Sequence, residues 1–217
     1  MTSGRQLIQQ ALREPMQAIG WTPRAAGWFT APLAPGFVGV VAVIIASEHA
    51  TPGTAEATLS VRLRREDVQP VVRDLLEDLV KDGGYRSSTT TTSIGYLMPG
   101  RSWRTWLATP ETAAFLAAEL AAAIRDYARP YLDRLAADPA LLVEAVKSSA
   151  IMGSASGPCT VAVTLARLGR PDEGWTFVQQ HVTSLGSRTD PAARETQRMA
   201  DRLRRWLDQL AQSDWSD

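Results

Sequence analysis

The sequence is poor in the residues on which most catalytic and metal chemistry depends. Its 217 residues include one cysteine and two histidines. A single cysteine excludes a disulfide framework and every zinc cluster built from cysteines. Two histidines leave little material for the common metal centres and catalytic triads. The composition therefore points away from these classes of function, and we expect no cofactor.

The chain also lacks net charge. Its 23 basic residues balance 23 acidic ones, so the formal charge at pH 7 is zero. This balance removes any bulk attraction to nucleic acid or to an anionic membrane. We therefore expect neither of them as a partner.

Long hydrophobic runs are missing as well. The longest apolar run, FVGVVAVIIA at residues 37–46, is much shorter than the ~20 residues that cross a bilayer. Residues 1–20 have an amphipathic pattern and lack the continuous apolar segment of a signal peptide. These features predict a soluble, cytoplasmic protein, which fits the single unpaired cysteine.

What is present begins with one helix and several strands. Apolar residues at spacings of three and four predict a helix over residues 3–19, with Gly20 at its C-cap. A short strand is expected over 27–31 and a central strand over 37–47, which is apolar on both faces. Residues 58–64 alternate between apolar and polar, so we expect a strand with one buried face. The short turn before it makes that pair antiparallel.

A helix and an edge strand follow. Asp67 is placed to cap a helix whose apolar positions run over residues 68–79. The hydroxyl-rich residues 87–93 predict an edge strand, because threonine is β-branched. The alternation at residues 94–98 is expected to continue this strand.

From residue 109 onward the sequence predicts helices. Thr109, Asp138 and Asp190 each precede a proline, as an N-cap residue does when proline takes the first helical position. Pro130 is expected to kink the first of these helices. The others are expected over residues 140–150, 158–168, 171–185 and 191–210.

The predicted fold class is α+β. We expect an antiparallel sheet of about four strands packed on helices, followed by an all-helical C-terminal half. Residues 1–108 would form the α+β part. Residues 109–217 would form a helical part that packs on it within one continuous domain.

Catalytic candidates are few. Cys159 at a predicted helix N-terminus would have a lowered thiol pKa, but a lone cysteine is more often a small buried hydrophobe, and we favour that interpretation. Glu48 and His49 lie at a predicted strand-to-turn junction, with Glu56 in the next strand. They define a weaker alternative pocket. They do not make a metal site, because no third ligand accompanies them.

The most distinctive stretch is SIGYLMPGRSWRTW at residues 93–106. Tyrosine, tryptophan and arginine are the usual anchors of protein interfaces. We therefore name Tyr96, Arg101, Trp103 and Arg104 as the candidate binding surface. The alternative is that the tryptophans pack under the junction between sheet and helix.

A basic stripe marks the last helix. Its arginines are Arg194, Arg198, Arg202 and Arg205. Such a stripe can bind phosphates. Asp201 and Asp208 on the same helix dilute it through the i,i+4 pairs Asp201–Arg205 and Arg204–Asp208, so we favour a solvated helix face over a nucleic-acid site.

Two segments resemble known families. Gly20-Trp21, Trp28-Phe29, the apolar strand, IGYLMPG with two following tryptophans, and the later ARPYL motif resemble the uncharacterised bacterial DUF4304-like domains over residues 7–146. Trp21 stands where such domains commonly carry phenylalanine. The resemblance implies an α+β fold and no assigned reaction. Residues 165–174 resemble one helix-turn-helix of a tetratricopeptide unit, which supports helical hairpins in this part.

These observations favour a non-catalytic module that binds another protein, of the immunity or accessory type, through the candidate binding surface. The oligomeric state is left undecided by the sequence, with a homodimer as one alternative. The alternative is a small-molecule-binding protein or enzyme with a pocket between sheet and helices, near Glu48 and His49.

Overall fold

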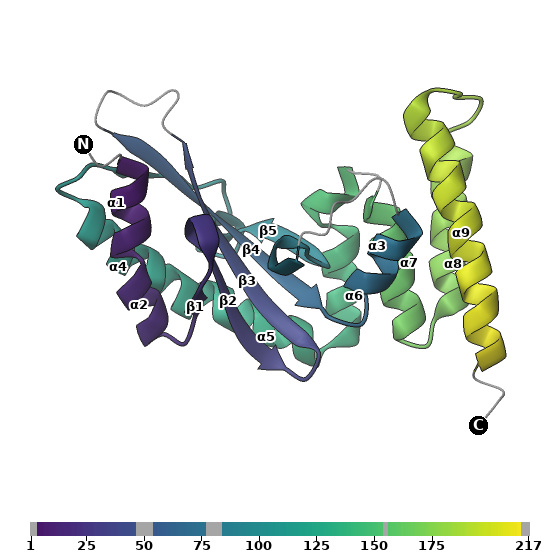
Figure 1. Ribbon diagram of the computed structural model, residues 1–217, viewed down its shortest axis with the longest axis horizontal. Helices are drawn as coiled ribbons and strands as arrows, with labels where there is room; N and C mark the ends of the chain where they lie inside the picture. Colours follow the sequence, from purple (N-terminus) through teal and green to yellow (C-terminus); the bar gives the residue numbers. More distant parts are fainter. Residues whose placement is uncertain (1–3, 47–53, 77–83, 154–155, 214–217) are drawn as a thin grey trace. The chain divides into compact units, whose positions relative to one another are not determined.

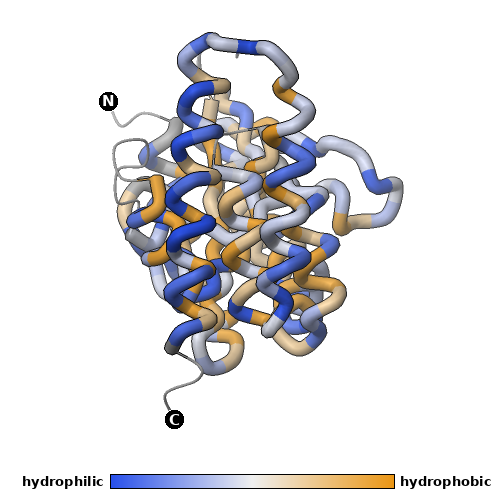
Figure 2. Tube along the Cα trace, turned by 90° about the vertical axis from the view of Figure 1, so that its right-hand side faces the viewer, coloured by the Kyte–Doolittle hydropathy of each residue, from blue (hydrophilic) through white to orange (hydrophobic). Residues whose placement is uncertain are grey.

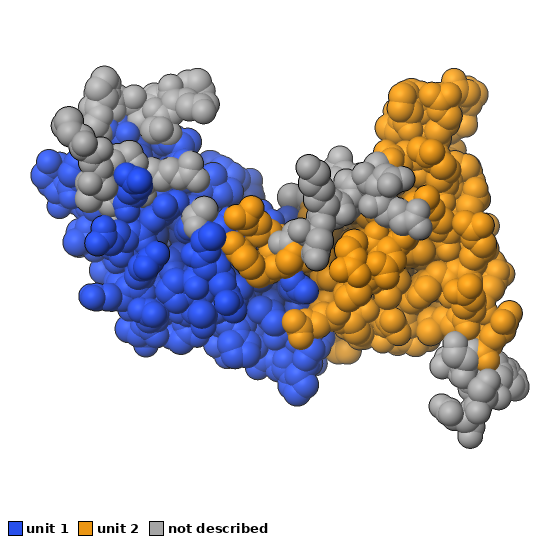
Figure 3. Space-filling model, viewed as in Figure 1, with its two compact units in different colours: residues 1–64, 91–138 blue, residues 65–90, 139–217 orange. Residues whose placement is uncertain are grey.

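The computed structural model of the chain describes residues 4–46, 54–76, 84–153 and 156–213. The chain divides into two compact units (Figure 3). Unit 1 comprises residues 1–64 and 91–138, and unit 2 comprises residues 65–90 and 139–217. The expected division at residues 108 and 109 stays a prediction.

Six strands of the described chain form one antiparallel sheet (Figure 1). Their order is β1-β2-β3-β4-β5, and β6 pairs with β4. The sheet confirms the predicted fold class and adds two short strands, β1 and β6, to the four that were expected. The strands are β1 (Thr22–Pro23), β2 (Trp28–Ala34), β3 (Phe37–Ala46), β4 (Ala55–Arg65), β5 (Thr90–Ser93) and β6 (Trp106–Ala108).

Strand β3 lies in the middle of the sheet, as its apolar sequence predicts. Gly39 on this strand leaves room for large side chains of unit 1. A Cβ atom there would lie 3.1 Å from Trp21 Cη2 and 3.2 Å from Leu132 Cδ1. Both of those side chains are fully buried, so this face of β3 belongs to the core of unit 1.

The opposite face of the sheet is covered in part by its own long side chains. The Arg62 guanidinium lies 4.7 Å from the centre of the Trp28 ring. Trp28 pairs with Ala42 across β2 and β3, so the stacked pair stands on the same face as Ala42. Ala42 is buried, and burial of Arg62 lowers the pKa of its guanidinium through desolvation.

The first helical segment is divided in two, where one helix was expected. One residue, Leu12, separates helix α1 (Gly4–Ala11) from helix α2 (Arg13–Ala18). Pro15 explains the break, because a proline ring clashes with the carbonyl four residues earlier, here that of Ala11. The predicted stop at Gly20 is confirmed: its φ is +83°, and Trp21 N–H donates to Met16 O at 2.9 Å.

Strand β5 ends the main path of the sheet, as predicted for an edge strand. The expected continuation of this strand to Met98 is wrong. Residues Ile94–Tyr96 instead form a 3₁₀ turn, η3. The amide of Leu97 donates to Ile94 O at 2.8 Å, which folds the chain back instead of extending it.

The long helix after β6 changes its winding midway. Helix α4 (Ala113–Ala123) continues into a π-helical stretch, η4 (Ile124–Ala128), and then into α5 (Arg129–Ala137). Pro130 lacks an N–H and crowds the preceding turn. The wider π turn lies directly before it, so the predicted disturbance at this proline takes the form of a π insertion.

Unit 2 is built from helices. Cys159 lies in its apolar core with side chains such as Val163, Val178 and Leu203. Asp190 caps the last helix, as predicted, by accepting a bond from Ala193 N–H at 3.1 Å. The helices are α3 (Gln69–Leu76), α6 (Pro139–Lys147), α7 (Ser156–Arg167), α8 (Pro171–Ser184) and α9 (Pro191–Ser213), with 3₁₀ turns at Gly84–Arg86 and Ala150–Gly153.

The hairpin between α7 and α8 agrees with the predicted helical hairpin. Gly169 has a φ of +75°, and Arg170 N–H donates to Leu165 O at 3.0 Å. Gly174 lets α8 approach α7 closely, because a Cβ there would lie 2.7 Å from Ala162 O.

Hydrophilic segments recur along α9 in Figure 2. Within the described part of the chain, no helix is both long and apolar enough to cross a bilayer.

Candidate functional site

The sequence-predicted surface lies on a loop that folds tightly on itself. Met98 N–H donates to Ile94 O at 3.2 Å, and Arg101 N–H donates to Met98 O at 3.1 Å. Gly95 closes the loop against its far end. A Cβ at this position would overlap the carbonyl oxygen of Ser102 and would lie 2.9 Å from the amide nitrogen of Arg104. The backbone of residue 95 is therefore held beside residues 102–104.

This loop also holds backbone strain. Gly100 has a φ of +90° and Arg101 a φ of +42°. The left-handed region suits glycine but costs other residues about 1–2 kcal/mol. Arg101 is the one non-glycine residue with a positive φ in the described part of the chain. Strained residues of this kind concentrate at functional sites.

Exposed apolar side chains gather in the same part of the chain. Tyr96 is 47% exposed, Trp103 60%, Leu107 65% and Phe115 75%. The other large exposed apolar side chain of the described residues is Ile44, at 51%. Four of the five therefore lie within residues 96–115, all in unit 1.

The two tryptophans of the stretch have different environments. Trp106 is buried, and its Nε1–H donates to Glu119 Oε1 on α4 at 2.8 Å. Trp103 is exposed. Both interpretations of the sequence therefore apply, each to one residue: Trp106 packs at the junction of β6 and α4, and Trp103 belongs to the exposed surface.

Arg104 is tied to this junction. Its Nη2 lies 3.7 Å from Glu119 Oε1, and its guanidinium lies 5.3 Å from the centre of the Trp106 ring. The pair with Glu119 is partly exposed, so it contributes little stability. Its effect is positional, because it places the end of the loop against α4.

Phe115 is a member of this region that the sequence interpretation missed. It lies four residues before Glu119 on α4, so the two side chains share one face of that helix. Because Glu119 contacts Arg104, this face adjoins the loop. The available signal was its position: Phe115 falls outside the apolar row of Leu116, Leu120 and Ile124, which are all buried. An aromatic residue on the exposed side of α4 is unexpected for packing alone.

The cation at the tip of the loop has no partner among the residues that the structure describes. The Arg101 side chain is exposed and makes no hydrogen bond, ion pair or ring contact with any of them. Arg104, in contrast, is held by Glu119 and Trp106. The surface thus combines two exposed aromatic rings with two guanidinium groups, of which that of Arg104 is engaged and that of Arg101 has no partner among the described residues. Such a set suits recognition of a protein surface, and it supplies no nucleophile or general base.

Most of the weaker alternative pocket falls outside the described part of the chain. Glu48 and His49 lie outside the described residues. Glu56 is exposed on β4, directly opposite Leu107 of β6. A reaction at His49 therefore stays an expectation.

Cys159 behaves as the small buried hydrophobe that the sequence favoured. It is fully buried on α7, and desolvation raises the pKa of its thiol to about 12. The thiolate is the nucleophilic form. Near neutral pH the folded protein therefore keeps this sulfur protonated, which is the opposite of activation.

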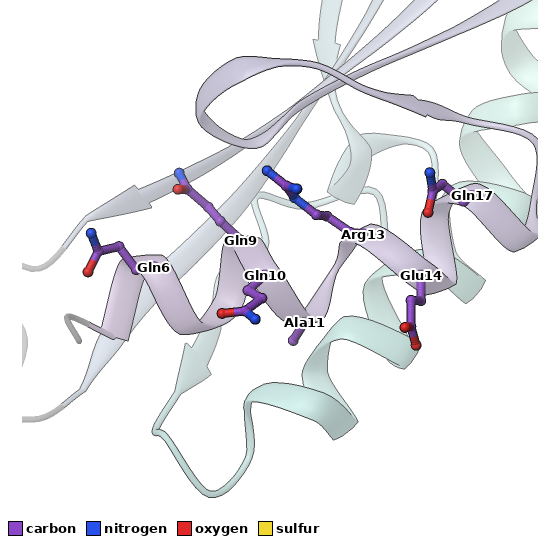
Figure 4. A pocket seen from close by; sticks show the side chains of 7 residues that line it. All are labelled: Gln6, Gln9, Gln10, Ala11, Arg13, Glu14 and Gln17. Carbon is purple, nitrogen blue, oxygen red and sulfur yellow. The ribbon is translucent and has the colours of Figure 1, made fainter.

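A hollow of about 720 Å³ lies along α1 and α2, lined mostly by glutamine side chains (Figure 4). Gln6, Gln9 and Gln17 point to one side of the helical run, whereas Gln10 and Glu14 point to the other. All the lining residues come from α1 and α2, which follow one another directly along the chain. Their polar groups diverge, so the hollow does not make a converging binding site.

A smaller groove of about 310 Å³ lies between α3 and α9 of unit 2. Arg202 and Arg205 line it together with Trp206 and Val71. Arg202 donates to Leu75 O at 3.2 Å, so one arginine of the predicted basic stripe binds the end of α3. The groove reaches the last described residues of α3, and we assign no ligand to it.

Of the two ion pairs predicted within α9, one forms. Arg204 and Asp208 form the expected i,i+4 ion pair at 3.1 Å. Asp201 accepts a bond from Gln197 at 3.4 Å in place of the expected pair with Arg205. Among the residues that the structure describes, no three metal-ligating side chains are grouped to hold an ion.

No family model, no curated protein and no solved structure matches the chain. The resemblance to DUF4304-like domains therefore stays an expectation, and the functional proposal rests on the residues of this chain.

Proposed function

We propose that the protein is a non-catalytic binding module that recognises another protein through Tyr96, Arg101, Trp103 and Arg104. These four residues are called the aromatic–arginine surface from here on. Phe115 extends it onto α4. An immunity or accessory protein, which acts by occupying a partner, would need such a surface and no reactive group.

The concentration of exposed apolar side chains carries this proposal. Large exposed apolar patches on soluble proteins usually mark interaction sites. Here four of the five large exposed apolar side chains among the described residues fall within 20 consecutive positions. The adjoining arginines fit the composition of binding hot spots, in which tryptophan, tyrosine and arginine predominate.

The closure of the loop supports the proposal further. Hydrogen bonds to Ile94 O and the close approach at Gly95 hold the loop in one shape before any partner arrives. A surface that is ordered in advance loses less conformational entropy on binding. The arrangement therefore favours recognition of a folded partner.

Affinity capture from lysate of the host cell tests this proposal. The tagged 217-residue chain is compared with its Trp103→Ala and Tyr96→Ala variants. We expect one stoichiometric partner to be captured by the original chain and lost, by at least tenfold, from both variants. Truncation of an interface anchor commonly costs about 1.4 kcal/mol or more, which is about tenfold in affinity.

Ile44→Ala is the matched control. Ile44 is a large apolar side chain of similar exposure, in the same unit but outside residues 96–115. The Ile44→Ala variant should capture the partner as the original chain does. Equal capture by all four proteins would contradict the proposal, as would loss of capture in the Ile44 variant alone.

A further inference from the structure

We propose that Arg101 binds a carboxylate on an acidic partner protein, and that this contact anchors the aromatic–arginine surface. The inference rests on the proposed function and specifies the chemistry of the partner. It follows from three observations: the strain at Arg101, its lack of a partner among the described residues, and the sign of the charges on the loop.

The strain is the first observation. Arg101 is held at a φ of +42°, directly after Gly100 at +90°. Glycine in place of arginine would adopt this backbone without the penalty that a Cβ brings. The folded chain thus carries a local cost at a position where the side chain makes no compensating contact with any described residue. A gain in binding is the kind of compensation that strained residues at functional sites show.

The second observation is the difference between the two arginines. Arg104 is engaged by Glu119 at 3.7 Å and lies against the Trp106 ring. Arg101 has no side-chain interaction with any residue that the structure describes. Arg104 therefore positions the loop, whereas no described residue occupies the Arg101 guanidinium, which can bind an external group.

The third observation concerns charge. Residues 96–105 contain two arginines and no acidic residue. An arginine guanidinium offers a planar set of donors that matches a carboxylate with two parallel hydrogen bonds. The exposed Trp103 and Tyr96 rings of the same loop are suited to an apolar side chain of the partner.

A protein carboxylate fits these features better than a polyanion does. Nucleic acids and anionic membranes are bound through several cations at once. In the described part of the chain this loop presents one cation without a partner, Arg101, which stands between Tyr96 and Trp103 in the sequence, on a chain without net charge. We therefore expect the partner to present aspartate or glutamate next to an aromatic or aliphatic residue.

A displayed library of random dodecapeptides, selected on the immobilised 217-residue chain, tests the inference. We expect the enriched sequences to carry an acidic residue next to an apolar one. A synthetic peptide of the enriched sequence is then titrated against each variant by fluorescence anisotropy. Arg101→Gln should weaken binding at least tenfold, because it removes the charge and the paired donors.

Arg13→Gln is the matched control, because Arg13 is an exposed arginine of the same unit that lies on α2. The Arg13→Gln variant should bind the peptide as the original chain does. Arg101→Gly adds a second readout. It should lose binding to the same extent as Arg101→Gln, yet unfold at a temperature about 2 °C higher than the original chain, since it relieves the strain. Loss of binding through misfolding would lower that temperature instead.

The outcomes separate this inference from the proposed function. If Trp103→Ala abolishes peptide binding and Arg101→Gln does not, the surface stands and the carboxylate anchor is wrong. If neither variant changes binding, both proposals are wrong. The inference is overturned if the selection enriches basic peptides or no peptides. It is also overturned if the chain binds polyphosphate or phosphatidylserine vesicles more tightly than the peptide and this binding depends on Arg101.

Discussion

Trp106 Nε1–H donates to Glu119 Oε1 at 2.8 Å, and this bond joins β6 to α4 beside the exposed loop. The same Glu119 oxygen lies 3.7 Å from Arg104 Nη2. One carboxylate thus holds both a buried ring and an exposed cation. If the loop is a preformed binding surface, this carboxylate is its attachment to the helix.

The bond predicts a stability cost for Trp106→Phe. Phenylalanine keeps most of the buried ring but cannot donate to Glu119, so the free energy of unfolding should fall by about 1–2 kcal/mol. Urea unfolding measures this change. Trp103→Phe is the control: its ring is exposed, so its effect should stay within about 0.5 kcal/mol. Equal effects of the two substitutions would contradict the different environments assigned to the tryptophans.

Gly95 should tolerate no side chain. Gly95→Ala places a Cβ against the Ser102 carbonyl, and we expect a loss of about 2 kcal/mol in unfolding free energy from this overlap. Gly100→Ala meets no atom within 4 Å, so it should cost only the conformational penalty of its positive φ, about 1 kcal/mol. Thermal unfolding of both variants checks the order. A larger loss at Gly100 would refute the close approach at Gly95.

The α9 cap should make part of the stability depend on pH. Arg188 donates to Asp190 at 2.8 Å and, with the Ala193 amide, lowers the pKa of the Asp190 carboxyl below its ordinary value of 3.8. A carboxyl whose folded pKa is lowered contributes stability above its unfolded pKa and loses it as the pH falls through the folded one.

The difference in unfolding free energy between the original chain and Asp190→Ala should therefore be constant from pH 7 to about pH 5 and shrink below pH 3.8. Urea unfolding at several pH values measures it. A difference that grows as the pH falls would show that the cap does not depend on the ionised carboxyl.

The Cys159 thiol should not react with thiol reagents in the folded protein. Its thiol is fully buried, with a pKa of about 12, so an aromatic disulfide reagent at pH 8 should label no cysteine in the native state. The same reagent in concentrated guanidinium should label one thiol per chain, which serves as the control. Rapid native labelling would contradict the buried position.

Sequence periodicity was sufficient for most of the fold. The alternation in β4 and the two-sided apolar pattern of β3 predicted their burial, and Gly20 and Asp190 predicted helix ends because a cap is set by local chemistry. The division of the first helix was not predicted, because Pro15 acts through its ring on the turn before it. The disturbance at Pro130 was predicted, but its form, a π turn, was not.

The candidate site was predicted only in part. The residue types at Tyr96, Arg101, Trp103 and Arg104 indicated an exposed surface, and all four are exposed. Which tryptophan packs and which one faces solvent depends on the pairing of β6 with β4. That pairing joins residues about 50 positions apart, and no local pattern encodes it. The strain at Arg101 depends likewise on how the loop closes.

Hydrogen exchange tests the central claim most directly. The amide exchange of the 217-residue chain is measured for the chain alone and for the chain with its captured partner, and the change is mapped along the sequence. We predict that added protection is strongest over residues 96–107 and is lost with Trp103→Ala, while α9 keeps its exchange unchanged. Protection confined to α9, with residues 96–107 exchanging as in the free chain, would contradict the assignment of the aromatic–arginine surface as the binding site.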